Sequence, residues 1–272
     1  MTLIAILIGT LAAGIGSVWL AAALSFGALA RYTQHMLSLA AGALMGTAFL
    51  HLLPEAFEGQ AKAQALFMTL LIGLVFFFLL DKAELWHHGH EHGHDHGHGH
   101  DDARDHAHDH AHEGEHAHES VASSGSWAVI AGDSVHCFGD GILIASAFIA
   151  DMRLGAIAAI AVLAHEVPHH MGDLIVLNRN SSNRKAALLK VSLAGAVTAL
   201  GGLIGYWLVE QLQGYLPYFL VVASSSFVYV ALADLIPQLQ KRLSLRETLA
   251  QIAWLLGGIG LVTLVSSLAR GH

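Results

Sequence analysis

Long apolar segments alternate with short polar ones along the whole chain. A membrane core about 30 Å thick requires roughly 20 apolar residues in a helix, because lipid offers the backbone no hydrogen-bond partner. Eight segments meet this requirement, so we expect an all-α integral membrane protein with eight transmembrane helices. The segments cover residues 2–26, 36–57, 65–86, 127–150, 154–178, 190–210, 216–239 and 249–269.

Composition supports this interpretation. Hydrophobic residues make up 54% of the 272 positions and charged residues only 12%, which is about half the charged share of an ordinary soluble protein. A soluble enzyme of this size could not cover its core with so few charges. The net charge of -8 provides no basic surface for nucleic acid, and the single cysteine, Cys137, excludes a disulfide within the chain.

The basic residues indicate which way the helices cross the membrane. If both termini lie outside, only Lys62, Arg153 and Arg270 of the 13 basic residues fall on the outer side. Cytoplasmic segments carry the excess of Lys and Arg, so this bias favours outer termini and a cytoplasmic loop between the third and fourth helices. We expect an integral protein of the plasma (inner) membrane.

The loop between the third and fourth helices is rich in histidine. From Trp86 to Glu119 it reads WHHGHEHGHDHGHGHDDARDHAHDHAHEGEHAHE, without the apolar periodicity needed for a core. We expect it to be disordered and to hold metal weakly at many interchangeable sites, as a buffer or sensor. The alternative is a solvated polar linker. The expected organisation is helices one to three in 1–86, this loop in 87–125, and helices four to eight in 126–272.

The fourth and fifth segments carry several ionisable residues at depth. Such groups are costly in a membrane interior, so they normally face the bundle and pair with each other or with an ion. Several of them are spaced four residues apart and therefore share a helical face. Each alone could be a polar contact between helices, but together they predict a divalent-metal site. The candidate ligands are His136, Cys137 and Asp140, followed by His165, Glu166, His169, His170 and Asp173.

Two other features are weaker signals, and Pro168 affects the expected site itself. His51 and Glu55 lie one turn apart in the second segment and could line a metal path, or could mark the polar end of that helix. Asp234, in the seventh segment, could be an exit ligand or an interfacial cap. Pro168 in the fifth segment removes a backbone donor and frees the carbonyl of Ala164 beside the expected site.

The sequence resembles a known family at these positions. The motifs HCFGDG and HEVPHHMGD are similar to the paired signature of the Zrt/Irt-like (ZIP) divalent-metal transporters, and AGALMGTAFLHLLPEAFE and YVALADLIP extend the resemblance. The resemblance implies import of zinc or a related divalent ion into the cytoplasm, through a two-metal centre built by the fourth and fifth helices. The family's ligands fall on His136, Cys137, Asp140, His165, Glu166 and His169.

Cys137 departs from the family pattern, which usually has Asn at this position. A thiolate is soft and charged, whereas an amide oxygen is hard and neutral, so the second metal position could favour zinc or cadmium over iron or manganese. Alternatively, the thiol stays protonated and this position is weaker. The sequence leaves both alternatives open.

Rival functions follow from the same residues. His165, Glu166 and His169 also spell HExxH, the zinc motif of metalloproteases, in which the glutamate is the general base. Pro168 distorts that turn, and the second cluster would be unexplained. The spacing of His136 and Asp140 resembles a helix of metal efflux carriers, but eight spans and the HEVPH segment argue against one. A structural or metal-storage role does not explain the cost of so many buried carboxylates.

We therefore expect a transporter rather than an enzyme. Metal would lose most of its water to the ligands and leave inward when the helices that carry the site move relative to the rest of the bundle. Glycines at 42, 46, 195, 201, 202 and 205 would allow helices to approach closely. The partners expected are divalent metal ions and the lipid bilayer. Such glycine faces could also form the interface of a homodimer.

Overall fold

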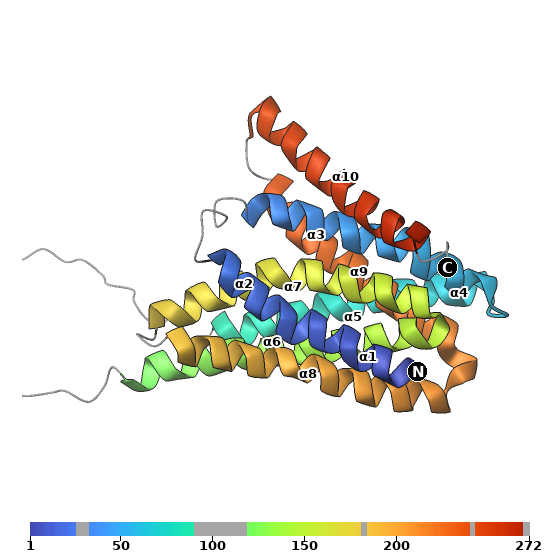
Figure 1. Cartoon of the computed structure of the whole chain (residues 1–272), viewed down its shortest axis with the longest axis horizontal. Coiled ribbons are helices and arrows are strands. Elements are labelled where there is room, and N and C mark those ends of the chain that lie inside the picture. Colours follow the sequence, from blue (N-terminus) through green and yellow to red (C-terminus); the bar gives the residue numbers. More distant parts are fainter. Residues whose placement is uncertain (26–32, 90–118, 181–183, 240–242, 269–272) are drawn as a thin grey trace, which may run out of the picture.

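The computed structural model describes residues 1–25, 33–89, 119–180, 184–239 and 243–268, and every regular element in these ranges is helical (Figure 1). Long helices running roughly along one direction form a bundle. The expected all-α fold is confirmed. In chain order the elements are α1 (Thr2–Leu11), η1 (Ala12–Gly16), α2 (Ser17–Ser25), α3 (Thr33–Thr47), η3 (Ala48–Leu52), α4 (Leu53–Glu58), α5 (Ala63–Gly89), α6 (Glu119–Ala150), α7 (Met152–Asn180), α8 (Arg184–Gln211), η4 (Gln213–Tyr215), α9 (Leu216–Leu239) and α10 (Leu245–Leu268).

Each predicted segment corresponds to one helical unit, but the ends of the histidine-rich loop differ. Because α5 continues to Gly89 and α6 begins at Glu119, residues 87–89 and 119–125, expected to be loop, are helical. The rest of that loop, 90–118, lies outside the described residues. The first two units each contain a π-helical turn, η1 and η3, of the kind that often marks functional sites in helices.

Seven of the helical units are long and apolar enough to cross a membrane. Among the described residues, α7 is the long helix that does not meet this criterion. Its sequence carries the polar run from His165 to Asp173, which lowers its hydropathy. The least apolar of the eight expected spans is therefore the one that carries most of the candidate ligands.

The helices pack in two sets. In one set, α6 packs against α7 and α8, and the unit α1–η1–α2 packs against α7 and α8. In the other, α3 packs against α9 and α10, and α5 packs against α9. The main connection between the sets is the contact of α3 with α7. Figure 1 shows α3 and α10 lying together along one side of the bundle, with α6 and α8 along the other.

Glycines hold neighbouring helices at close approach. A Cβ at Gly141 of α6 would collide with the carbonyl oxygen of Thr198 in α8, and a Cβ at Gly201 would collide with that of Phe138. Between α3 and α10, a Cβ at Gly42 would collide with the carbonyl oxygen of Leu255. These glycine faces are filled by helices of the same chain. The expectation that they serve a homodimer is therefore not supported.

α6 and α7 are antiparallel and are separated only by Asp151. The Asp151 carboxylate accepts hydrogen bonds from the backbone N–H groups of Arg153 (2.8 Å) and Leu154 (3.2 Å), which caps the start of α7. The start of α1 and the end of α10 lie at the same end of the bundle as this turn, whereas α6 begins and α7 ends at the opposite end (Figure 1). The middle of α6 therefore faces the middle of α7.

The outer faces of α5 and α10 are apolar. Phe67, Ile72 and Phe76 of α5 are each more than half exposed, as are Leu256 and Leu264 of α10. Broad exposed apolar surface on helices of this length is typical of contact with lipid. The polar donors, in contrast, are gathered inside the bundle.

Candidate metal centre

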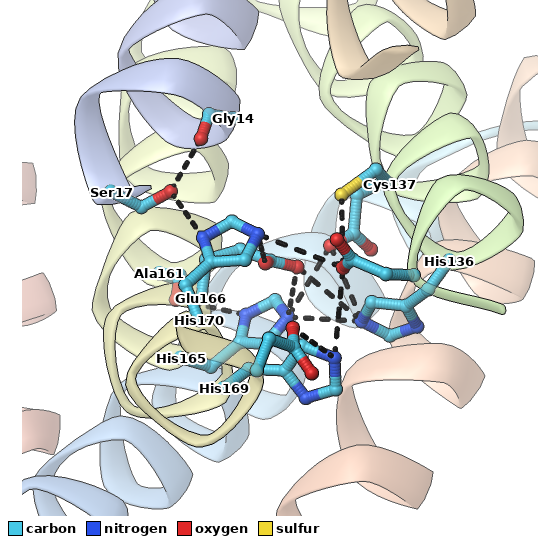
Figure 2. Close-up of polar contacts among 12 residues, drawn as sticks. Gly14, Ser17, His136, Cys137, Ala161, His165, Glu166, His169 and His170 are labelled. Carbon is cyan, nitrogen blue, oxygen red and sulfur yellow. Dashed lines mark hydrogen bonds and ion pairs between the residues drawn. The ribbon is translucent and has the colours of Figure 1, made fainter. Parts of the chain in front are cut away.

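The candidate ligands of α6 and α7 point toward one another across the contact between these two helices (Figure 2). They form three sets of side chains in which one donor atom from each residue lies within 4.8 Å of the others. We call these sets the first, second and third donor groups. The first is His136, Asp140, His165 and Glu166; the second is Asp133, Cys137, Glu166 and His170; the third is Asp133, His169 and Asp173.

The first donor group combines two imidazoles and two carboxylates. The Nε2 atoms of His136 and His165 lie 3.3 Å apart. His165 Nε2 is also 3.3 Å from Asp140 Oδ2 and 3.3 Å from Glu166 Oε1. Four such atoms converging on one point form the mixed nitrogen and oxygen environment that suits Zn²⁺. His136, with 31% of its side chain exposed, is the most solvent-accessible member of this group.

The second donor group contains a residue that was not among the sequence candidates. Asp133 lies one turn before Cys137 on α6, and the Cys137 thiol donates a weak hydrogen bond of 3.6 Å to Asp133 Oδ1. His170 Nε2 lies 3.6 Å from the same oxygen and 3.2 Å from Glu166 Oε2. All four members are buried. The spacing of Asp133 to Cys137, i to i+4, was the signal in the sequence that could have identified it.

The third donor group lies at the more exposed side of the centre. His169 Nε2 is 3.7 Å from Asp133 Oδ1 and 3.8 Å from Asp173 Oδ2. The His169 side chain is 48% exposed and that of Asp173 is 14% exposed. The sequence placed His169 in one set with His165, but the two belong to different donor groups.

Two carboxylates connect the groups. Glu166 directs Oε1 at the histidines of the first group and Oε2 at His170 of the second. Asp133 Oδ1 is shared by the second and third groups. A carboxylate can bind one ion with each oxygen or move between two ions. Because Glu166 and Asp133 each belong to two donor groups, a metal can pass between neighbouring groups while one carboxylate stays bound.

Several polar atoms of the centre are buried without a hydrogen bond. Among the described residues, none donates one to Asp140 Oδ2 or to either Glu166 oxygen, and His170 Nε2 has no hydrogen-bond partner. Buried polar groups are normally paired, and leaving them unpaired is costly. A cation held among them would provide the missing partner, because each is a lone-pair donor.

Ser17 of α2 fixes the orientation of His170. The Ser17 hydroxyl donates to the carbonyl oxygen of Gly14 (2.6 Å), and its oxygen lies 3.0 Å from His170 Nδ1 (Figure 2). Because the single hydroxyl proton is committed to Gly14, the oxygen must accept a hydrogen bond from Nδ1–H. This hydrogen bond selects the tautomer in which His170 Nε2 carries a lone pair toward the second donor group. This contact could not be predicted from the sequence.

Other sequence candidates are placed elsewhere. His51 belongs to η3 and is in none of the three donor groups found among the described residues. Asp234 lies on α9, but its side chain is outside the described residues. Pro168 sits inside α7, which continues as one helix through it; since proline lacks an N–H, the Ala164 carbonyl has lost its usual helical partner.

The comparison with known families identifies the chain. The family model described as "ZIP Zinc transporter" matches residues 1–266. The chain belongs to the ZIP zinc transporter family. The resemblance seen in the HCFGDG and HEVPHHMGD motifs is therefore confirmed over almost the whole chain, and ZIP proteins are integral membrane transporters rather than enzymes.

Individual ZIP relatives match to different extents. Zinc transporter foi of Drosophila melanogaster is 32% identical over 145 residues, covering 53% of this chain and 20% of that protein. Zinc transporter ZIP13 of Pongo abelii is 27% identical over 292 aligned positions, covering 97% of this chain and 79% of that protein. Zinc transporter ZIP4 of Homo sapiens is 34% identical over 136 residues, covering 50% and 20%. The chain thus spans only a fifth of the length of two of these three relatives.

The rival functions lose support. A metalloprotease would need both histidines of HExxH on one ion with Glu166 free to act on water. Instead, His165 and Glu166 share the first donor group, while His169 lies with Asp133 and Asp173. The efflux-carrier alternative is not favoured by membership of the ZIP family.

Proposed function

We propose that this ZIP protein imports divalent metal, with zinc as its main substrate, through the first and second donor groups. The observation that carries the proposal is the pair of donor groups that share Glu166 inside a membrane-spanning bundle. Imidazole, carboxylate and thiol together suit zinc, and would also accept cadmium. Iron and manganese, which prefer harder donors, would bind less well to the second group.

Transport proceeds by alternating access. The donor groups reside on α6 and α7, which pack with α1, α2 and α8, whereas α3, α5, α9 and α10 form a separate set. Movement of the first set relative to the second, at the contact of α3 with α7, would expose the centre to the two sides in turn. The metal would exchange its water for the donor atoms on entry and regain water on exit.

The orientation of the bundle in the membrane follows from the basic residues. With both termini outside, the α6–α7 turn faces the exterior, and the ends of α7 and α8 near Arg179, Arg184 and Lys185 face the cytoplasm. Asp173 then lies on the cytoplasmic side of the first donor group, since it follows His165 along α7. The histidine-rich loop would bind metal that has left the centre. A homodimer would use faces other than the filled glycine contacts, such as those of α5 and α10.

Zinc uptake into proteoliposomes tests the proposal. His136→Ala and His165→Ala each remove a donor from the first group and should abolish uptake while the protein still inserts. His35→Ala is the matched control, because His35 stacks on Trp254 of α10 (ring centroids 5.9 Å apart) and belongs to no donor group. Uptake by either donor variant at the rate of the control would refute the assignment. Repeating the assay with an imposed pH gradient shows whether protons accompany the metal.

A further inference from the structure

The third donor group is more exposed than the second, with which it shares Asp133. His169 is 48% exposed, whereas His165 and His170 are no more than 4% exposed. Asp173, one turn further along α7, lies nearer the end of that helix. Along α7, His169 and Asp173 therefore lie between His165 of the first donor group and the end of the helix.

The geometry around His169 is that of an incomplete metal site. Its Nε2 lies between two carboxylate oxygens, at 3.7 Å from Asp133 and 3.8 Å from Asp173. Asp173 Oδ2 is inaccessible to solvent and has no hydrogen-bond donor among the described residues. One imidazole and two carboxylates are donors of the kinds that bind zinc, and three of them leave the fourth tetrahedral position for water. The opening is on the exposed side of His169.

Asp133 joins this site to the buried centre. The same oxygen, Oδ1, lies 3.6 Å from both Cys137 Sγ and His170 Nε2 and 3.7 Å from His169 Nε2. An ion held by the second donor group therefore already has one ligand of the third. Its transfer would exchange Cys137, Glu166 and His170 for His169, Asp173 and water while Asp133 remains bound.

We propose that Asp133, His169 and Asp173 form a third metal position, to which the second donor group passes its ion through Asp133 before release. This rests on the proposed function, because it assumes that metal occupies the second donor group. It assigns His169, which the family pattern places among the ligands of the two-metal centre, to the release site. Under the proposed topology this site faces the cytoplasm.

A thiol placed in the third donor group tests the site with Co²⁺ as the probe. Cys137→Ser removes the only cysteine of the chain, so any thiolate-to-cobalt charge-transfer absorption must come from an introduced thiol. In this background Asp173→Cys should give a saturable band, since cysteine is similar in size to aspartate and its thiolate binds such ions well. Adding His169→Ala should raise the half-saturating Co²⁺ concentration by about tenfold or more.

Gly172→Cys in the same background is the matched control. Gly172 is exposed, a Cβ there meets no neighbour within 4 Å, and its direction is about 100° around the helix from Asp173. It should need a much higher Co²⁺ concentration to give a band, because its thiol points about 100° away from the position of Asp173, although His169 lies only three residues before it. An equal band from Gly172→Cys would overturn the proposal. The absence of a band from Asp173→Cys would also overturn it, because the group would then be only an ion pair between His169 and its carboxylates.

A transport measurement keeps the proposal testable if the thiol variants fold poorly. Asp173→Asn, with Cys137 intact, should slow zinc uptake about tenfold while the cobalt band of Cys137 persists. Uptake at the full rate would overturn the transfer step. If the unaltered protein shows neither the Cys137 band nor zinc uptake, the proposed function itself is contradicted. Failure of the proposed function can therefore be distinguished from failure of the transfer step.

Discussion

The hydroxyl oxygen of Ser17 lies 3.0 Å from Nδ1 of His170, and both side chains are completely buried. Ser17 is the first residue of α2, directly after the π-helical turn η1, and accordingly reaches α7 from another helix. The contact determines which nitrogen of His170 faces the second donor group. Metal binding at that group thus depends on a residue 153 positions away in the sequence.

Ser17→Ala should weaken metal binding at the second donor group without removing a ligand. The ring of His170 would lose the acceptor that holds its Nδ1–H, so the tautomer and orientation that present Nε2 would no longer be selected. We expect affinity for Co²⁺, followed through the thiolate band of Cys137, to fall about tenfold.

Ser224→Ala provides the control for that measurement. Ser224 is also fully buried, but its hydroxyl donates to the Leu220 carbonyl of its own helix, α9. It should leave the cobalt titration unchanged. Equal titration curves for Ser17→Ala and the unaltered protein would show that the serine hydroxyl plays no part in binding.

Gly141→Ala should destabilise the protein, because the added Cβ would meet the carbonyl oxygen of Thr198 in α8 and the nitrogen of Gly202, which lies 2.6 Å from its position. Neither backbone group can move without shifting a helix. We expect a cost of about 1–3 kcal/mol and a melting temperature in detergent that is lower by roughly 2–12 °C.

Gly139→Ala, two residues away on the same helix, is the matched variant, since a Cβ there meets nothing within 4 Å. Its melting temperature should equal that of the unaltered protein. If both variants melt alike, the close approach of α6 to α8 is not what holds these helices together. Since α6 carries His136 and Asp140, Gly141→Ala should also reduce zinc uptake.

Replacing every histidine between residues 90 and 118 by glutamine should leave initial zinc uptake intact and reduce the amount of metal bound by the protein. Neutral imidazole is the ligand, so the metal that this loop holds should be lost as the pH falls through about 6.5 and the rings protonate. Metal binding measured by equilibrium dialysis at several pH values checks this. Complete loss of uptake by a correctly inserted variant would place the loop on the transport path.

The sequence predicted the number and order of the helices well, because apolar length alone determines a membrane span. It predicted the candidate ligands of α6 and α7 for a similar reason, since polar residues at depth stand out against apolar neighbours. It could not decide which of the adjacent residues His169 and His170 faces the buried groups. That depends on the rotation of α7 against α6, which is set by packing rather than by spacing.

Two omissions have other causes. Asp133 lies near the end of the apolar stretch, where a carboxylate is unremarkable in sequence. Its spacing of four residues from Cys137 was a weak signal, and the approach of His169 and His170 gives it a role. Ser17 looked like one of many small residues of a membrane helix. Its contact arises from tertiary structure, because α2 packs against α7.

Cys137 is the residue that we expect to influence metal selectivity most directly. Its side chain is fully buried, and its sulfur lies 3.6 Å from Asp133 Oδ1, in one group with Glu166 and His170. If the thiolate binds the ion, Cys137→Asn replaces a soft anionic donor by a neutral oxygen. Transport should then continue, but preference should shift from zinc and cadmium toward iron and manganese. Competition among these four ions during uptake measures the shift.

A second property of Cys137 separates a ligand from a packing residue. A thiolate bound to zinc reacts slowly with alkylating reagents, so zinc should protect Cys137 in a concentration-dependent manner. A small buried cysteine that only fills space would react at the same low rate with or without metal. Because it is the only cysteine in the chain, the labelled fraction reports on this site alone. Unchanged selectivity in Cys137→Asn, with alkylation indifferent to zinc, would leave Cys137 as packing and reduce the second donor group to Asp133, Glu166 and His170.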